Sequence, residues 1–175
     1  ARLVELGAKA DLSFWFGPDS LPHDISVDDK ALEVKAKVGP SENVAINGLY
    51  QLSVKPAKSL HLCVIRVLPD AGDQSIRALI DRMVTLGVEL LDVMARVASL
   101  GLSPGSSWWD QPMTIDSVSI YEVSRSFPRL SPEVLSIDLN STMISKVRYE
   151  VALDSIQAIE TNDPLAWWWK KGTPE

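Results

Sequence analysis

The sequence predicts an α/β fold built on a mixed sheet, and three observations support this class. Segments 23–27 and 30–38 alternate apolar and polar residues and flank an Asp-Asp pair, which is typical of a β-hairpin. The nearly continuous apolar run 60–68 indicates a strand buried on both faces, as in parallel sheets. Segment 75–100 carries apolar residues at helical spacing. A hairpin, a buried parallel strand and a long helical region together favour a mixed sheet with helices.

The first part of the chain, residues 1–101, is expected to form the core of the domain. Apolar spacing and turn signals predict a helix over 2–12, hairpin strands over 23–27 and 30–38, a short helix over 43–54 and a strand over 60–68. The segment 69–73 has the composition of a turn, and Asp73 is a candidate cap for a helix that begins at Gln74. Gly87 is expected to divide the helical segment 75–100 into two helices.

The second part, residues 102–175, is expected to extend the same domain with antiparallel β structure. A loop over 102–112 comes first. The apolar period then changes to two, which predicts antiparallel strands over 113–123, 134–139 and 143–153. The tail, which contains three consecutive tryptophans, receives no assignment.

The composition excludes several classes of protein. Of the 175 residues, 46% are hydrophobic and 23% are charged, which is typical of a globular protein and not of a disordered or collagen-like one. The apolar runs are too short to span a bilayer and no targeting segment is visible, so we expect a cytoplasmic protein with no membrane partner. The single cysteine, Cys63, excludes a disulfide framework and a Cys-based zinc site.

The charge balance limits the kind of partner. Lys and Arg number 17 and Asp and Glu number 23, and the net charge of −6 argues against a broad DNA-coating surface. It leaves room for a local basic groove. The chain begins with Ala1 rather than Met, and we expect that residues upstream were removed or lie on another chain.

Two carboxylates and a lysine converge in the predicted hairpin. If the Asp-Asp pair forms a two-residue loop, the register places Asp24 directly opposite Glu33. Directly opposed side chains have Cβ atoms about 4.5–5.5 Å apart. Lys35 lies two residues beyond Glu33 on the same face, while Leu32 and Val34 point to the other face, toward the core. We therefore expect a polar patch above a hydrophobic sheet.

These residue types suit phosphodiester hydrolysis. Opposed carboxylates repel each other, and such a pair favours a bound cation. Oxygen ligands without Cys or His clusters suit a hard ion, Mg²⁺ or Mn²⁺, which polarises a phosphoryl oxygen and lowers the pKa of a bound water. Lys35 would position that water or neutralise charge that develops on the phosphate. The alternative interpretation is a solvated hairpin face with an ordinary salt bridge.

The same residues carry a family resemblance. Asp24 followed by Glu33-Val34-Lys35 resembles the PD-(D/E)XK nuclease superfamily, the fold of many restriction endonucleases. Further motifs, in order, resemble a group of bacterial PD-(D/E)XK family proteins, and the similarity covers nearly the whole chain: Trp15-Phe16-Gly17-Pro18, Gln51-Leu52, Tyr121-Glu122-Val123 and Phe127-Pro128-Arg129-Leu130. Members of this group usually carry an earlier helix with an acidic residue, ahead of where this chain starts.

The resemblance implies a fold and a site. The fold is a restriction-endonuclease-like αβββαβ core, with one strand fewer in this chain. Asp24 and Glu33 would bind Mg²⁺ or Mn²⁺ together with the backbone carbonyl of Val34, and Lys35 would be the catalytic lysine. DNA would be the substrate, in bacterial restriction or phage defence. Because two cuts across a duplex need two active sites, a homodimer is one expected partner, and other restriction or defence subunits are another.

Several residues near the motif have competing interpretations. The literal Pro-Asp pair ends at Asp19, but Asp19 lies five residues before Asp24, about 15 Å along a strand, so we select Asp24. Gln51, on the helix expected over 43–54, would hold a water or phosphate at the site or else lie on the surface. His23 is expected to pack on the face opposite Asp24.

The aromatic and basic residues outside the motif are also ambiguous. The tryptophans at 108–109 and 167–169 would stack on unpaired bases or fill the core. A set of basic residues would line a DNA channel or be scattered surface charge: Lys37, Lys55, Lys58, Arg125, Arg129, Lys146 and Arg148. The sequence therefore favours a metal-dependent DNA endonuclease over a non-catalytic module that binds DNA or protein. An enzyme acting on another phosphate ester is the weakest of the three interpretations.

Overall fold

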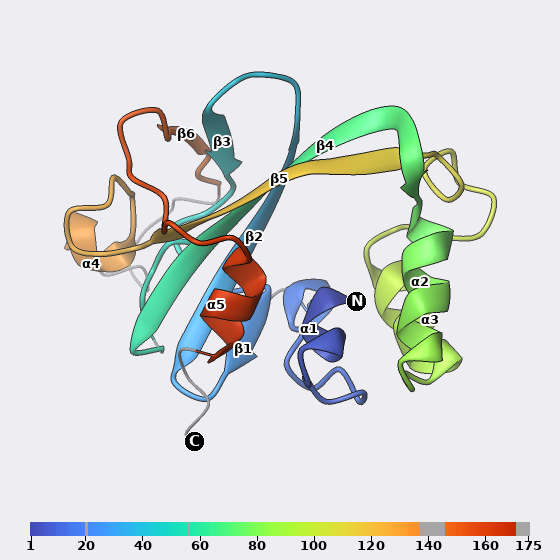
Figure 1. Ribbon diagram of the computed structural model, residues 1–175. Coiled ribbons are helices and arrows are strands. Elements are labelled where there is room, and N and C mark those ends of the chain that lie inside the picture. Colours follow the sequence, from blue (N-terminus) through green and yellow to red (C-terminus); the bar gives the residue numbers. More distant parts are fainter. Residues whose placement is uncertain (20, 56, 137–145, 171–175) are drawn as a thin grey trace.

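The centre of the fold is a mixed sheet (Figure 1). The computed structural model describes residues 1–19, 21–55, 57–136 and 146–170, and within them the sheet has four strands in the order β1-β2-β4-β5. These strands are β1 (Ile25–Val27), β2 (Lys30–Val38), β4 (Ser59–Gln74) and β5 (Met113–Glu122). β2 runs parallel to β4, whereas β1 and β5 are antiparallel to their neighbours. The predicted α/β class with a mixed sheet is therefore confirmed.

A smaller sheet and several helices surround these strands. The smaller sheet pairs β3 (Asn43–Ile46) with β6 (Tyr149–Ala152) in antiparallel orientation. The helices are α1 (Arg2–Glu5), the 3₁₀ helix η1 (Gly17–Asp19), α2 (Ile76–Thr85), α3 (Leu90–Ser99), α4 (Pro132–Leu135) and α5 (Pro164–Lys170). No helix in the described residues is long and apolar enough to cross a bilayer.

The hairpin of β1 and β2 has the predicted register. Val27 pairs with Lys30 across a two-residue loop, and Ile25 pairs with Leu32. Asp28 in that loop has a φ of 52°, a left-handed conformation that Asp adopts more readily than most residues. The following parallel strand β4 contains the predicted apolar run, but it is longer than expected and continues to Gln74.

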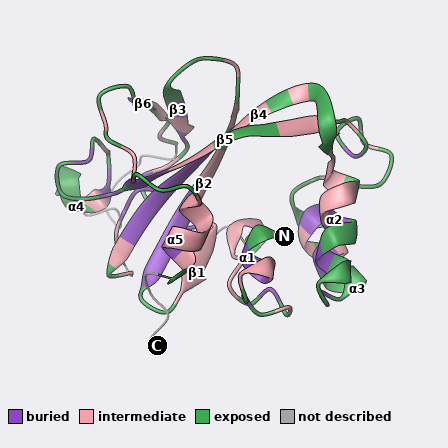
Figure 2. Cartoon of the chain, viewed as in Figure 1, coloured by how far each residue is buried: buried purple, intermediate pink, exposed green. Residues whose placement is uncertain are grey.

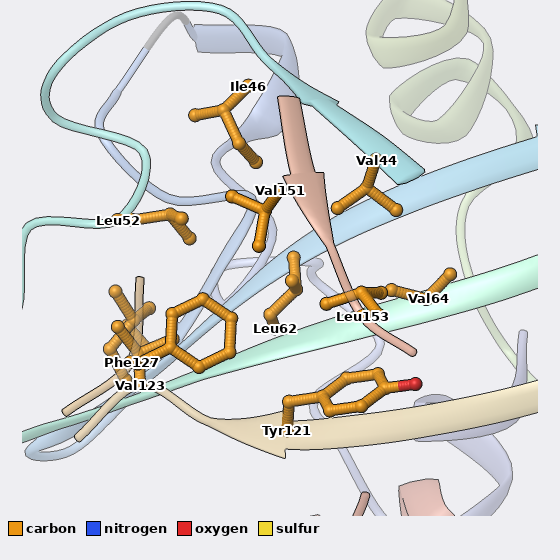
Figure 3. Close-up of a cluster of buried hydrophobic side chains, with 12 residues drawn as sticks. Val44, Ile46, Leu52, Leu62, Val64, Tyr121, Val123, Phe127, Val151 and Leu153 are labelled. Carbon is orange, nitrogen blue, oxygen red and sulfur yellow. The ribbon is translucent and has the colours of Figure 1, made fainter. Parts of the chain in front are cut away.

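Both faces of the central sheet are covered by apolar side chains. On the face that carries Glu33, called here the site face, Ala31 of β2 packs in a cluster with residues of β3, β4, β5 and β6. Figure 3 shows how Val44 and Val151 of the smaller sheet gather there with Leu62 of β4. The opposite face, called here the helix face, packs against residues of α1 and α5. Figure 2 shows the resulting buried stretches in β2 and β4.

The face of β2 that was expected to be polar does carry Glu33 and Lys35, but it is buried around Glu33. The smaller sheet covers the site face, so that Glu33 is only 1% exposed. Toward its end β2 becomes open instead, and Val38 is exposed. The polar residues of the predicted site therefore lie at the margin of a buried cluster and not on an open surface.

The predicted short helix over 43–54 is also wrong. This segment contains β3, followed by turns that include Gly48 at a φ of 130°. Val44 and Ile46 are buried because they pair with β6, a partner more than 100 residues away that local periodicity cannot reveal. No helix lies between β2 and β4 in the described residues, so the expected αβββαβ order is not reproduced.

Other boundaries also differ from the prediction. The predicted turn over 69–73 lies within the bounds of β4, but it interrupts the pairing with β5, because Pro69 and Gln74 both pair with Met113. Ser75 rather than Asp73 caps α2. Ser75 accepts a hydrogen bond from the Ala78 N–H at 3.1 Å. The helical segment does divide near Gly87, as predicted, but the helix expected over 2–12 ends at Glu5.

The C-terminal part is less regular than predicted. β5 is confirmed, although it belongs to the central sheet. In the strand expected over 134–139, the first two residues belong to α4, residue 136 follows that helix, and residues 137–139 lie outside the described residues. Of the strand expected over 143–153, residues 149–152 form β6, and residues 143–145 lie outside the described residues. The unassigned tail contains α5.

Candidate functional site

Asp24 lies immediately before the first residue of β1, on the site face beside Glu33. It directly precedes Ile25, whose partner Leu32 directly precedes Glu33, so the hairpin register carries both carboxylates to one place. The Asp24 Oδ2 atom accepts a hydrogen bond from the backbone N–H of Val34 at 2.7 Å. The Asp24 carboxylate thus accepts the Val34 N–H in place of a backbone carbonyl, just before β1 begins. Because the N–H and C=O of one strand residue point to the same side, the Val34 carbonyl faces the Asp24 side.

The segment before β1 fixes the backbone of Asp24. The N–H groups of Phe16 and Gly17 both donate to the Asp24 carbonyl oxygen, at 2.7 and 3.0 Å, and Trp15 forms a β-bridge with Ile25. A Cβ atom on Gly17 would lie 2.7 Å from the Asp24 Oδ1 atom, closer than such atoms normally approach. The Trp-Phe-Gly-Pro motif therefore acts as a support for the predicted metal ligand.

Glu33 is the buried carboxylate of the site. Burial is the main cause that raises its pKa, the nearby Asp24 carboxylate acts in the same direction, and the Lys35 ammonium opposes both, with a resulting pKa of about 7. Lys35 Nζ lies 2.7 Å from Glu33 Oε1 as an ion pair. Among the described residues, however, Oε1 has no hydrogen bond of acceptable geometry. A buried carboxylate oxygen in this state is a suitable ligand for a cation.

Lys35 connects the carboxylates to Gln51. Its Nζ atom donates a hydrogen bond to Gln51 Oε1 at 2.9 Å, and the same oxygen accepts the N–H of Asn47 at 2.8 Å. Gln51 lies in the turn after β3 and not on the predicted helix, yet the turn delivers it to the site. The predicted residues Asp24, Glu33, Lys35 and Gln51 are therefore close together in space.

A pocket of about 280 Å³ opens at these side chains. Asp24, Glu33 and Gln51 line it, together with six further residues: Gly17, Leu21, Pro22, Asn47, Gly48 and Tyr50. The described residues contain no group of three or more His, Cys, Asp or Glu side chains that could hold a metal. A cation here would rely on two carboxylates and the Val34 carbonyl, an all-oxygen set that suits a hard ion.

Two neighbouring residues behave as expected. His23 packs as expected: it is buried with its Nε2 atom 2.8 Å from the carbonyl oxygen of Ser53, and burial lowers its pKa, although the Asp24 carboxylate opposes this shift. Asp19, the rejected candidate, pairs with Arg96 at 3.4 Å. The supporting roles of Gly17 and Asn47 and the presence of Tyr50 were not predicted. For Gly17, the short separation between the Trp-Phe-Gly-Pro motif and Asp24 in the sequence was an available signal; for Asn47 and Tyr50 there was none.

Some of the aromatic and basic residues have structural roles, and others stay candidates for contact with DNA. Trp109 and Trp168 are buried in hydrophobic clusters and unavailable for stacking, whereas Trp108 is 54% exposed. Lys37 pairs with Glu42 and Lys58 pairs with Asp29, so these two cations are partly neutralised. The remaining candidates for a DNA channel stay a prediction.

Comparison with known proteins supports the resemblance. The model of a family described as "Putative PD-(D/E)XK family member, (DUF4420)" matches residues 3–154, a stretch that contains all the site residues above. No curated protein and no solved structure matches the chain. Since the matched stretch covers most of the 175 residues, the chain belongs to this PD-(D/E)XK-type family.

Proposed function

We propose that this protein is a metal-dependent DNA endonuclease of the PD-(D/E)XK type. The observation that carries the proposal is the buried Glu33 carboxylate, held beside Asp24 and Lys35 at a pocket and lacking a well-aligned hydrogen bond on Oε1. Burying a carboxylate removes its favourable hydration, and carboxylates buried in this way are often found where they bind a cation or transfer a proton. The family description supplies the class of reaction.

Each residue has a distinct proposed role. Asp24, Glu33 and the Val34 carbonyl hold Mg²⁺ or Mn²⁺, and the bound ion would polarise the phosphoryl group and acidify a water. Lys35 positions the attacking water or balances charge that develops on the phosphate. Gln51 fixes the Lys35 ammonium through its amide oxygen, 2.9 Å from Nζ. The setting in bacterial restriction or phage defence, and a homodimer or defence subunits as partners, belong to the same proposal.

A non-catalytic DNA- or protein-binding module is the second candidate. It is favoured by the small ligand set, because the described residues provide two carboxylates and no third acidic or histidine side chain at the site. The net charge of −6 also weakens attraction to nucleic acid. In this case the fold would bind a partner with the pocket inactive.

Calorimetric titration with Mn²⁺ tests the site directly. The parent is compared with the double variant Asp24→Asn/Glu33→Gln and with a matched control, Asp28→Asn/Asp29→Asn, which removes two carboxylates from the exposed hairpin turn. We expect the parent and the control to bind Mn²⁺ and the site variant not to bind. Equal binding by all three proteins would place the ion elsewhere.

A cleavage assay separates the two candidate functions. Circular duplex and circular single-stranded DNA are incubated with the parent and each variant in Mg²⁺ or Mn²⁺. Metal-dependent cleavage that is lost in the site variant supports the nuclease. Metal binding or DNA binding without any cleavage would instead favour the non-catalytic module.

A further inference from the structure

An exposed tyrosine stands at the rim of the pocket that holds the carboxylates. Tyr50 is 50% exposed and lines the pocket with Asp24 and Glu33. Leu21, which is 52% exposed, and Pro22 line the same pocket. The pocket therefore combines two carboxylates with exposed apolar and aromatic side chains. These side chains offer a flat, apolar contact beside the charged groups.

The turn that carries Tyr50 is anchored on both sides. Leu49 and Leu52 are buried in the protein interior, and the N–H of Ser53 donates to the Tyr50 carbonyl at 3.0 Å. This arrangement leaves Tyr50 and Gln51 pointing away from the core between two buried leucines. The exposure of Tyr50 is thus set by the fold of the turn and is not an effect of a loose loop.

The position of Tyr50 relates it to the proposed chemistry. It is adjacent in sequence to Gln51, whose amide oxygen bonds Lys35. A phosphate bound near Lys35 and the carboxylates would place its neighbouring nucleotide at the rim of the same pocket. Aromatic rings bind such bases by stacking, with little preference for the identity of the base.

We infer that Tyr50 stacks on an unpaired base next to the scissile phosphate, so that the site takes DNA that is single-stranded or locally unpaired. In a continuous duplex the faces of each base are covered by its neighbours, so an exposed ring can stack only on a base that has left the stack. This inference rests on the proposed function and adds a substrate class to it.

Binding measurements with and without bases test the inference. The probes are a fluorescein-labelled single-stranded oligonucleotide and a strand of equal length whose central nucleotides are abasic. Fluorescence anisotropy is read in Ca²⁺, a hard cation with the same oxygen ligands, and a gel checks that the strands stay intact. The variants are Tyr50→Ala, Tyr50→Phe and Leu91→Ala, the last being an exposed apolar residue of α3 outside this pocket.

The expected pattern depends on the base. Tyr50→Ala should weaken binding of the normal strand by about fivefold to 150-fold and leave binding of the abasic strand unchanged. Tyr50→Phe and Leu91→Ala should bind both strands as the parent does. A completely paired, blunt-ended hairpin duplex should bind more weakly than the single strand, and Tyr50→Ala should reduce that preference.

Three results would overturn the inference. They are an unchanged affinity of Tyr50→Ala for the normal strand, an equal loss on both strands, and a loss in Tyr50→Phe as large as in Tyr50→Ala, which would indicate a contact of the hydroxyl group. Failure of the nuclease proposal can be distinguished from failure of this inference, because the nuclease proposal is tested by cleavage with the parent and Asp24→Asn/Glu33→Gln, whereas the Tyr50 inference is tested by binding. A base-dependent Tyr50 effect without cleavage would leave a protein that binds unpaired DNA.

Discussion

Strand β2 carries two buried charges, and they differ in how well the protein satisfies them. Lys30, 7% exposed, lies on the helix face, where its Nζ atom donates to the carbonyl oxygens of Trp168 and Trp169 at 2.8 and 2.7 Å. The same ammonium lies 4.7 Å from the centre of the Trp168 ring. Glu33, three residues later on the site face, has one ion pair and an oxygen without a well-aligned hydrogen bond.

The difference distinguishes a structural charge from one that fits the proposed function. Lys30 joins the last carbonyls of α5 to the start of β2, a place where a cation is favourable because of the helix dipole. Glu33 has an ion pair with Lys35, on an oxygen that lacks a well-aligned hydrogen bond, and it borders a pocket. Burial alone therefore says little about function; the more informative observation is a buried charge whose hydrogen bonds are incomplete beside an open volume.

The largest expected effect is on catalysis, through Glu33→Gln. The amide keeps the shape of the side chain but removes its charge, so cation binding and cleavage should fall together. We expect a loss of cleavage rate of about a hundredfold or more, comparable to the removal of one key electrostatic group. The rate is measured on plasmid DNA in Mn²⁺. Lys30→Met serves as the control and should cleave at the parental rate; cleavage by Glu33→Gln at that rate would show that the site is assigned wrongly.

The second effect is a dependence of stability on pH that belongs to Glu33. Its pKa is near 4.5 in the unfolded chain and about 7 when folded, so between these pH values the folded state binds more protons. The free energy of unfolding should therefore be highest at the acidic end and fall as the pH rises through this window, by up to about 3 kcal/mol.

Denaturant titrations at several pH values check this contribution. Glu33→Gln cannot titrate, so its stability should vary less across the window, and it should exceed the parent in stability at pH 8. Lys30→Met should keep the parental pH dependence. Parallel curves for the parent and Glu33→Gln would contradict a raised pKa at this position.

The third effect is on stability alone, through Lys30→Met. Methionine keeps an apolar stem of similar length but leaves the carbonyls of Trp168 and Trp169 without their donor. We expect a loss of about 1–3 kcal/mol in the free energy of unfolding, the usual cost of a buried acceptor that loses its partner. Mn²⁺ affinity should not change, because Lys30 lies on the opposite face of β2. A variant as stable as the parent would show that burial of the ammonium offsets its hydrogen bonds.

The contrast between the two charges was only partly visible in the sequence. The two-residue turn at Asp28 and Asp29 fixes the hairpin register, and alternation then places Asp24 beside Glu33. Those signals are local and short in range, which is why this part of the site was predictable. The burial of Glu33 was not, because its cover comes from β3 and β6, which pair across more than 100 residues.

The position of Gln51 also shows that local sequence patterns cannot reveal long-range packing. A helix was predicted over 43–54 because Val44, Leu49 and Leu52 fit helical spacing. All three residues are buried, but Val44 and Leu52 pack in the cluster that includes residues of β4, β5 and β6 and not along one helix face. Gln51 still reaches Lys35, so the residue was predicted at the site although its secondary structure was wrong. Likewise, nothing local indicated that Lys30 would bind the end of α5.

The smallest expected effect tests the support of the site, through Gly17→Ala. The added methyl group would lie 2.7 Å from Asp24 Oδ1, which belongs to a side chain that can rotate away. Stability should therefore change by no more than about 1 kcal/mol, but the displaced carboxylate should weaken Mn²⁺ binding by about tenfold, as is typical when a supporting contact of a metal ligand is lost. Calorimetry measures both Gly17→Ala and the combination with Asp24→Asn.

The combined variant decides whether Gly17 acts through Asp24. Once Asp24 is an asparagine, the methyl group has no charged ligand to displace, so Gly17→Ala should add no further loss of affinity. Additive losses would mean that the methyl group disturbs the pocket by another route, such as the Trp15 ring, whose Nε1 atom would lie 3.3 Å from it. Non-additivity would instead show that the segment before β1 supports the metal site through Asp24. Lys30 has no such support from a neighbouring loop, because it bonds directly to the carbonyls of α5.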